Sequence, residues 1–174
     1  MMDGESSNNI ILIGMPGAGK STLGVVLAKI LNMDFLDADL VIQKQCGKTL
    51  QRIIDERGVE GFLAVEEEAL CGVQTHDTII ATGGSAVYSD RAMDYLRSIG
   101  TAVYLEISYE SLIGRLGDLQ ERGVVLKGGV SMSLRELFDE RKPLYERHAD
   151  LVVNVDDLSI TAAARRVASA LRVE

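Results

Sequence analysis

The chain has 174 residues, of which 47% are hydrophobic, and it carries a formal net charge of −8 at pH 7. This length fits a single domain that buries a sizeable core, and the hydrophobic content excludes a disordered chain. Because the sequence is acidic and has no basic stripe, we expect neither a nucleic acid nor a membrane as a partner.

Short β-rich runs alternate with longer amphipathic runs, which predicts a parallel α/β sheet with helices on both faces. No repeat or interdomain linker interrupts this alternation, so residues 1–174 are expected to form one domain. The sequence predicts strands over residues 9–14, 34–37, 77–82, 101–106 and 150–155. It predicts helices over residues 20–31, 39–45, 49–57, 60–74, 89–98, 108–116, 133–147 and 159–172.

A glycine-rich motif lies between the first predicted strand and the first predicted helix. Residues 14–21 read Gly-Met-Pro-Gly-Ala-Gly-Lys-Ser, which matches the phosphate-binding loop G-x-x-x-x-G-K-[ST]. Glycines let the backbone N–H groups point at a polyphosphate, and the following helix directs its positive end to the same place. Lys20 can reach the β- and γ-phosphates, and the Ser21 hydroxyl can ligate Mg²⁺. The alternative is a glycine-rich turn that only caps a helix. We expect a bound nucleoside triphosphate and its Mg²⁺, held by Gly17, Ala18, Gly19, Lys20, Ser21 and Thr22.

Two carboxylates, Asp37 and Asp39, follow the second predicted strand. Ligands of open α/β folds bind in the crevice above the carboxyl ends of the strands, so these two groups can divide the chemistry. One would help to hold Mg²⁺, and the other would accept a hydrogen bond from an attacking hydroxyl. Alternatively, Asp39 caps the helix that starts at Leu40, and Asp37 is a solvated turn residue.

The third predicted strand ends in Ala-Thr-Gly-Gly-Ser, residues 81–85. Gly83 and Gly84 let backbone N–H groups approach a small ligand closely, or they form only a tight turn.

The segment 117–133 contains several glycines and little periodicity, which indicates a mobile lid or a disordered insertion. Beside a phosphate loop we favour a lid, which excludes water during phosphoryl transfer. Arg122 in this lid can move onto the γ-phosphate, and Arg141 can bind a substrate carboxylate. Arg115 follows the fourth strand, and each of the three arginines could instead be an ordinary surface residue.

Several residues bear on compartment and assembly. Cys46 and Cys71 have no metal-ligand spacing and are expected to be reduced, buried thiols. The first nine residues lack the features of a secretion signal, so we expect a cytoplasmic protein. Nothing resembles a coiled coil, and a monomer is expected. His148, at a helix end, is expected on the surface, and His76 receives no role.

Taken in order, these segments resemble the shikimate kinase family over residues 9 to 172. The segments that carry the resemblance are the phosphate loop, residues 31–39, Gly61-Phe62 with Glu66, residues 81–84, the lid, and residues 141–150. The resemblance implies a three-layer α/β fold with a five-stranded parallel sheet, a lid over about 117–133, and an acceptor-binding region over about 39–75. It also implies ATP and Mg²⁺ as cofactors.

The resemblance further implies roles for individual residues. Lys20, Asp39 and Arg122 would be catalytic, and Ser21 and Asp37 would serve Mg²⁺. Arg115 would stack on the adenine, and Arg122 would also contact the nucleotide. The acceptor would be bound by Asp39, Phe62, Glu66, Gly83, Gly84 and Arg141, the last being one of two arginines on a carboxylate.

Three positions depart from the family pattern. The family reads Gly-Glu-x-x-Phe-Arg-x-x-Glu, whereas residues 58–66 here read Gly-Val-Glu-Gly-Phe-Leu-Ala-Val-Glu, so Leu63 replaces the second arginine. Ser85 replaces a third glycine, and Gly123 replaces the proline of the lid. Losing one charge-assisted pair costs roughly 1.5–3 kcal/mol, or about ten- to a hundredfold in affinity. Arg57 or Lys48 could compensate for this loss.

The sequence therefore predicts an ATP- and Mg²⁺-dependent kinase that acts on a hydroxyl of a small polar metabolite, with shikimate as the first candidate. A hydroxy amino acid such as homoserine is the alternative acceptor, its ammonium lying near Glu66. A non-catalytic nucleotide-binding regulator is the alternative of another class, and Asp37, Asp39 and Arg122 argue against it.

Overall fold

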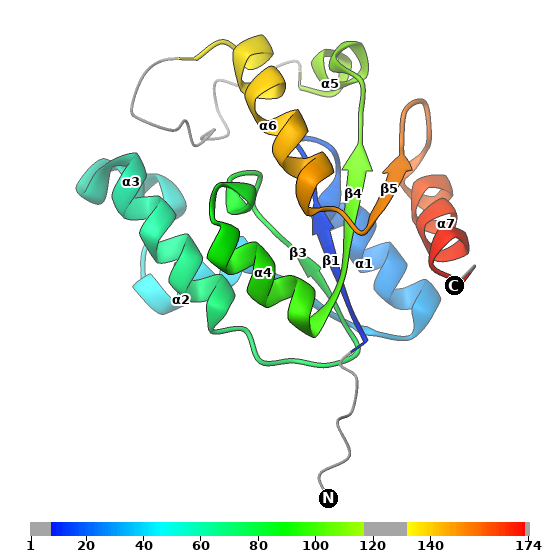
Figure 1. Ribbon diagram of the computed structural model, residues 1–174, viewed down its shortest axis with the longest axis horizontal. Helices are drawn as coiled ribbons and strands as arrows, with labels where there is room; N and C mark the ends of the chain where they lie inside the picture. The colour runs from blue at the N-terminus through cyan, green and yellow to red at the C-terminus, as the bar shows by residue number, and fades with distance from the viewer. Residues whose placement is uncertain (1–7, 117–131, 173–174) are drawn as a thin grey trace, which may run out of the picture.

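Five parallel strands form the central sheet, in the order β2-β3-β1-β4-β5 (Figure 1). The computed structural model describes residues 8–116 and 132–172. All five predicted strands are confirmed, each boundary lying within one residue of the expected position. The strands are β1 Asn9–Ile13, β2 Asp34–Asp37, β3 Thr78–Ala81, β4 Gly100–Glu106 and β5 Leu151–Asn154.

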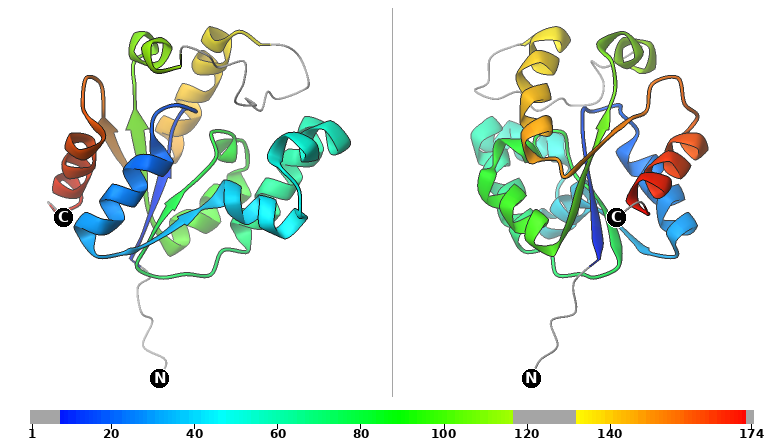
Figure 2. Two further views of the ribbon diagram at one scale, coloured as in Figure 1. Left: turned by 180° about the vertical axis from the view of Figure 1, so that it is seen from behind. Right: turned by 45° about the vertical axis from the view of Figure 1, so that its right-hand side comes forward.

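Helices cover both faces of the sheet, which gives the expected three layers. Figure 2 shows α1 and α7 together on one face and α4 and α6 on the other, while α2 and α3 lie beyond the β2 edge. The helices are α1 Lys20–Leu31, α2 Ala38–Cys46, α3 Leu50–Cys71, α4 Asp90–Ile99, α5 Tyr109–Arg115, α6 Leu134–His148 and α7 Ile160–Leu171, with a short 3₁₀ turn, η1, at Ala86–Tyr88.

Differences from the predicted helices have local causes. Helices α4 to α7 each begin one residue later than predicted, because a serine occupies the N-cap and its side chain accepts a hydrogen bond from a backbone N–H. The two helices predicted over 49–57 and 60–74 form the single element α3, which breaks at Gly58 (φ 70°, ψ 177°) and ends before Gly72. The 3₁₀ turn η1 was not predicted.

The core lies on both faces of the sheet. Every residue of β1 and β3 is buried, as expected for parallel strands covered on two sides. A second, smaller cluster fills the space between α2 and α3 and consists of Ile42, Ile53, Phe62 and Ala69. This separate cluster holds the α2–α3 pair as a unit beside the sheet.

The centre of the sheet also determines where a ligand can bind. Ile10 of β1 pairs with Ile79 of β3 on one side and with Thr101 of β4 on the other. The chain thus leaves β1 in one direction and later returns on its other side, which opens a crevice at the carboxyl ends of these strands.

Two expectations about single residues are wrong. Cys46 and Cys71 are free thiols but only half-buried, since each lies at the last residue of a helix. His148 is 3% exposed rather than on the surface. It lies at the end of α6 close to the start of α4, where its Nε2 is 3.2 Å from Asp90 Oδ1.

Some expectations fall outside the described residues. The predicted lid over about 117–133 does so except for its last two positions, and Arg122 and Gly123 lie within the part that is not described. Within residues 8–116 and 132–172, no helix is long and apolar enough to span a membrane.

Candidate active site

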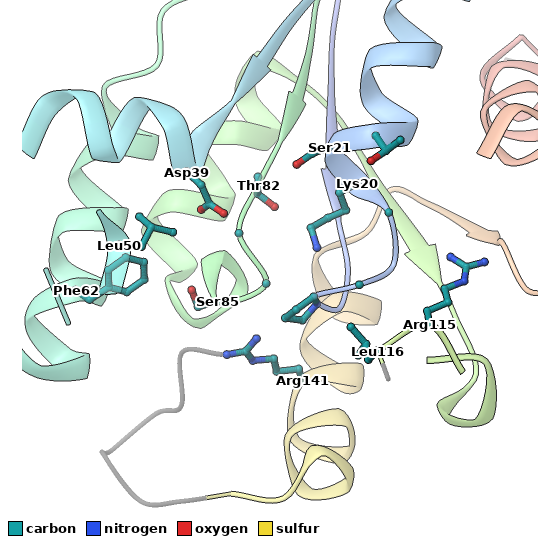
Figure 3. A pocket seen from close by; sticks show the side chains of 16 residues that line it. Lys20, Ser21, Asp39, Leu50, Phe62, Thr82, Ser85, Arg115, Leu116 and Arg141 are labelled. Carbon is teal, nitrogen blue, oxygen red and sulfur yellow. The ribbon is translucent and has the colours of Figure 1, made fainter. Parts of the chain in front are cut away.

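A cavity of ≈ 370 Å³ opens at the carboxyl ends of the central strands (Figure 3). Figure 3 shows Asp39, Ser85 and Arg141 around one end of it and Arg115 at the other. The predicted site residues that line it are Gly17, Gly19, Lys20, Ser21, Thr22, Asp39, Phe62, Gly83, Gly84, Arg115 and Arg141. The structure therefore brings together residues from six separate segments.

The phosphate loop forms the middle of the cavity. Gly17 (φ 86°) and Gly19 (φ 93°) adopt positive φ angles that other residues rarely adopt, and Gly19 is the N-cap of α1 without a side-chain hydrogen bond. The first N–H groups of α1 are therefore available to an anion. This arrangement fits a polyphosphate.

Lys20 lies buried at the start of α1 and points into the cavity (Figure 3). Its Nζ donates hydrogen bonds to the carbonyls of Gly14 (2.7 Å) and Met15 (2.9 Å). Burial lowers the pKa of Lys20 to about 8, and the negative charge of Asp39 opposes this shift. A phosphate at this position would strengthen the hold on the lysine's proton.

Ser21 and Asp37 meet beside the phosphate loop, where Ser21 Oγ donates to Asp37 Oδ2 at 2.7 Å. The other oxygen of Asp37 accepts from the backbone N–H groups of Asp39 (2.9 Å) and Leu40 (3.4 Å), so Asp37 is the N-cap of α2. The alternative that placed the cap on Asp39 is therefore wrong, and the Asp39 side chain is left to face the cavity.

The oxygen donors of Ser21 and Asp37 fit a magnesium ion that is shared with a nucleotide. Among the described residues, no group of three or more His, Cys, Asp or Glu side chains could hold a metal ion. Mg²⁺ is usually bound through one or two protein oxygens together with substrate phosphates and water, so a full protein cage is not needed.

Two carboxyl groups approach each other beside Gly83, at the acceptor half of the cavity: Asp39 lines the cavity, whereas Glu66, which was predicted to bind the acceptor, is not among the residues that line it. A Cβ atom on Gly83 would lie 2.7 Å from Glu66 Oε1 and 3.0 Å from Asp39 Oδ1. Burial raises the pKa of Asp39, and the charge of Asp37 adds to the shift. Burial also raises the pKa of Glu66 to about 7, against a hydrogen bond of 2.6 Å from Ser85 Oγ. A larger residue at position 83 would have to displace one of these two groups.

Arg141 supplies the positive charge of this half. Its side chain is 1% exposed, Nε donates to the Tyr88 hydroxyl at 3.1 Å, and the guanidinium lies 5.1 Å from the centre of the Tyr88 ring. A Cβ atom on Gly84 would lie 2.8 Å from Arg141 Nη1, so the backbone and the guanidinium approach closely. One turn further along α6, the Tyr145 hydroxyl donates to the Gly84 carbonyl at 2.7 Å.

Arg115 forms the other end of the cavity. It donates to the carbonyls of Ala18 (3.2 Å) and Val155 (3.0 Å), and these bonds fix the guanidinium between the phosphate loop and the segment after β5. A guanidinium held in this way offers a flat surface on which an aromatic base can stack.

Three residues considered for the acceptor do not face this cavity. Leu63 lines a separate cavity of ≈ 250 Å³ on the far side of Ser85 and Glu66. Lys48 forms an ion pair with Glu56, and Arg57 lines a third, open cavity. Neither cation lines the acceptor half, and Arg141 is the arginine that the described residues place there.

Sequence reasoning missed several lining residues. Pro16, Leu50, Thr82, Ser85 and Leu116 also line the cavity. Pro16 and Thr82 lie inside motifs that the sequence shows, and Ser85 stands out in the sequence only as a departure from a family pattern. Leu50 and Leu116 give no signal, because an apolar residue in a helical pattern reads as core.

The comparisons with known proteins agree with this geometry. A family model described as shikimate kinase matches residues 16–172. The chain belongs to the shikimate kinase family. It is thereby an enzyme of the phosphotransferase class that takes an alcohol group as acceptor.

The match to individual family members extends over nearly the whole chain. A shikimate kinase of Pseudomonas paraeruginosa is 39% identical over 94% of this chain and 96% of its own length. One of Vibrio parahaemolyticus is 37% identical over 94% and 95%. The solved shikimate kinase of Acinetobacter baumannii in complex with shikimate superposes with a TM-score of 0.85 at 28% identity, covering 97% of this chain and 95% of that one.

Proposed function

We propose that this protein transfers the γ-phosphoryl group of Mg²⁺–ATP to a hydroxyl of shikimate. The observation that carries the proposal is the placement of Asp39 and Arg141 around the acceptor half of the cavity, directly beside the phosphate loop. A carboxylate that accepts a hydroxyl proton and a guanidinium that pairs with a carboxylate suit a hydroxy acid. The shikimate kinase solved with shikimate covers 97% of this chain.

The chain's residues divide the chemistry between them. Lys20 and the N–H groups at the start of α1 hold the phosphates, and Ser21 and Asp37 would hold the Mg²⁺, which offsets phosphate charge when bound. Asp39 orients the acceptor hydroxyl and accepts its proton. The raised pKa of Asp39 suits that role, because a carboxylate with a raised pKa binds a proton more readily.

Further residues bind and enclose the substrates. Arg141 pairs with the acceptor carboxylate, Phe62 packs beside it, and Arg115 stacks on the adenine. Arg122 closes over the transferred group from the lid. We also infer a cytoplasmic location, which the free thiols of Cys46 and Cys71 support.

A hydroxy amino acid such as homoserine is the second candidate acceptor. It is favoured by one observation, the approach of Glu66 and Asp39 to the same point near Gly83, which places two carboxyl groups opposite the single guanidinium of Arg141. An ammonium group would fit between those carboxyl groups.

A coupled ADP-release assay with Mg²⁺–ATP tests the proposal with shikimate, homoserine and other small hydroxy acids. We expect turnover with shikimate at a sub-millimolar KM. Stimulation by homoserine without shikimate turnover would support the second candidate. No stimulation by any acceptor would favour the non-catalytic regulator.

Substitutions distinguish the two halves of the site. Arg141→Gln should raise the KM for shikimate about ten- to a hundredfold and leave the KM for ATP unchanged. Arg135→Gln is the matched control, since Arg135 lies on the exposed side of the same helix and pairs with Asp139. Lys20→Met should lower kcat by about a hundredfold or more.

A further inference from the structure

The hydrogen bond between Ser85 and Glu66 is an unusual feature of the acceptor half. Both side chains are buried, with exposed fractions of 4% and 2%. Ser85 Oγ donates to Glu66 Oε2 at 2.6 Å, joining the 3₁₀ turn after β3 to the middle of α3. Within the described residues, the Glu66 carboxyl group accepts this one hydrogen bond. A buried carboxyl group with one donor depends strongly on that donor.

The second oxygen of Glu66 lies beside Gly83, which lines the acceptor half of the main cavity, while Glu66 itself lines the second cavity. Oε1 lies 2.7 Å from the position of a Cβ on Gly83, and Asp39 Oδ1 lies 3.0 Å from the same position. Fixing Oε2 therefore holds Oε1 on the side of Gly83 where Asp39 also lies. Through this contact region Glu66 can influence Asp39 and the Gly83 backbone, both of which line the acceptor half.

The Glu66 side chain has room to move on its other side. On the far side of Ser85 and Glu66 lies the cavity of ≈ 250 Å³ that Leu63, Leu70 and Ala86 also line. Because this space is open, packing alone does not hold the carboxyl group toward Asp39. The Ser85 hydroxyl supplies the missing restraint.

We propose that Ser85 is a positioning residue that sets acceptor affinity by holding Glu66 Oε1 behind Gly83 and beside Asp39, at the wall of the acceptor half. The inference rests on the proposed function, since it requires an acceptor in this half of the site. It assigns a role to a residue whose hydroxyl does not itself react. Binding of ATP, at the other end of the cavity, is independent of it.

Kinetics of Ser85→Ala and Ser85→Gly test the proposal, because both variants remove the hydroxyl. We expect the KM for shikimate to rise about tenfold while the KM for ATP and kcat stay within about twofold. The hydrogen bond from Ser85 lowers the pKa of Glu66, so the pH dependence of the shikimate KM should shift to higher pH in both variants. A merely structural role of Ser85 would not move this profile.

Ser89→Ala is the matched control. Ser89 donates to Glu67 on the same two segments and caps α4, but it does not line the main cavity. The control should unfold at a lower temperature than the wild type, because its helix cap is lost, and keep its KM values. A folded Ser85→Ala protein with the KM and pH profile of the wild type would overturn the inference.

The experiment also separates this inference from the proposed function. If the wild type uses homoserine but not shikimate, the same variants are measured with homoserine, and the same changes in KM and pH profile are expected. A wild type that uses neither acceptor overturns the proposed function and this inference together. An active wild type with unchanged variants overturns the inference alone.

Discussion

The carboxyl group of Glu66 loses almost all contact with water on folding, since its side chain is 2% exposed. Burial raises its pKa to about 7 from an ordinary value of 4.5, although the Ser85 hydrogen bond opposes the shift. Between these pH values the folded chain binds more protons at Glu66 than the unfolded chain. This group therefore lowers the free energy of unfolding progressively as the pH rises from about 4.5 to 7.

Glu66→Gln should remove this contribution, because the amide is neutral at every pH. We expect the free energy of unfolding of the variant, relative to wild type, to be higher at pH 8 than at pH 5, by on the order of 1–3 kcal/mol. Urea denaturation at the two pH values measures the difference. Glu60→Gln on the exposed side of the same helix is the control for the loss of one charge, and equal curves for Glu66→Gln and wild type would contradict the prediction.

At the scale of elements, the N-cap residue of helix α2 serves both the helix and the site. Asp37 caps the helix with Oδ1 and accepts from Ser21 with Oδ2, so one side chain anchors α2 beside the start of α1. The cap also determines the direction of α2. The backbone N–H of Asp39, two residues later, donates to Asp37 Oδ1, and the Asp39 carboxyl group lines the cavity.

Two substitutions of Asp37 separate its roles. Asp37→Asn keeps an oxygen for the cap and should fold with nearly wild-type stability, but its Mg²⁺ requirement should rise about tenfold or more. Asp37→Ala should show the same Mg²⁺ defect and lose about 1 kcal/mol of stability in addition. The measurements are Mg²⁺ titrations of activity and thermal unfolding. An unchanged Mg²⁺ requirement in Asp37→Asn would leave Asp37 with the cap alone.

The turn after β3 is the element where backbone and ligand groups come closest. In Gly83→Ala the new Cβ must displace Glu66 or Asp39, and we expect kcat/KM for shikimate to fall roughly ten- to a hundredfold. Gly114→Ala in α5 is the control, because a Cβ there meets nothing within 4 Å. It should retain its kinetics and gain up to about 1 kcal/mol of stability. Equal kinetics in both variants would show that the turn accommodates a Cβ atom at position 83 without loss of activity.

Local sequence predicts some features of this fold and misses others. The strands and the phosphate loop were predictable, because hydrophobic runs and the glycine-lysine motif are continuous in sequence. The bonds from Ser85 to Glu66 and from Arg141 to Tyr88 were not, since each joins distant segments that only the fold brings together. The same reason accounts for His148, whose burial depends on where α4 begins relative to α6.

At the scale of the whole molecule, the exposed apolar side chains bear on assembly. Among the described residues, the large hydrophobic side chains that are exposed are Val25, Leu40, Ile113 and Val152, and they belong to four different elements. A stable interface usually buries a contiguous apolar patch, and four exposed side chains from separate elements are few for such a patch.

We therefore expect a monomer in solution. Size-exclusion chromatography with light scattering should give a mass of 18.9 kDa at micromolar concentration, and addition of Mg²⁺–ADP and shikimate should not change it. A species of twice that mass would contradict the expectation and would direct attention to the edge strand β5, where Val152 is exposed.

The sheet order has a consequence for synthesis of the chain. β1 leaves the ribosome first, yet its two neighbours begin only at Thr78 and Gly100. Pairing with partners so distant in sequence requires large loops to close before any stabilisation is gained. Until the chain has been made as far as Glu106, β1 lacks a neighbour on at least one side. A nascent chain that ends before Glu106 carries the phosphate-loop motif but lacks one or both of the strands that flank β1. We therefore expect the chain to bind nucleotide only late in its synthesis.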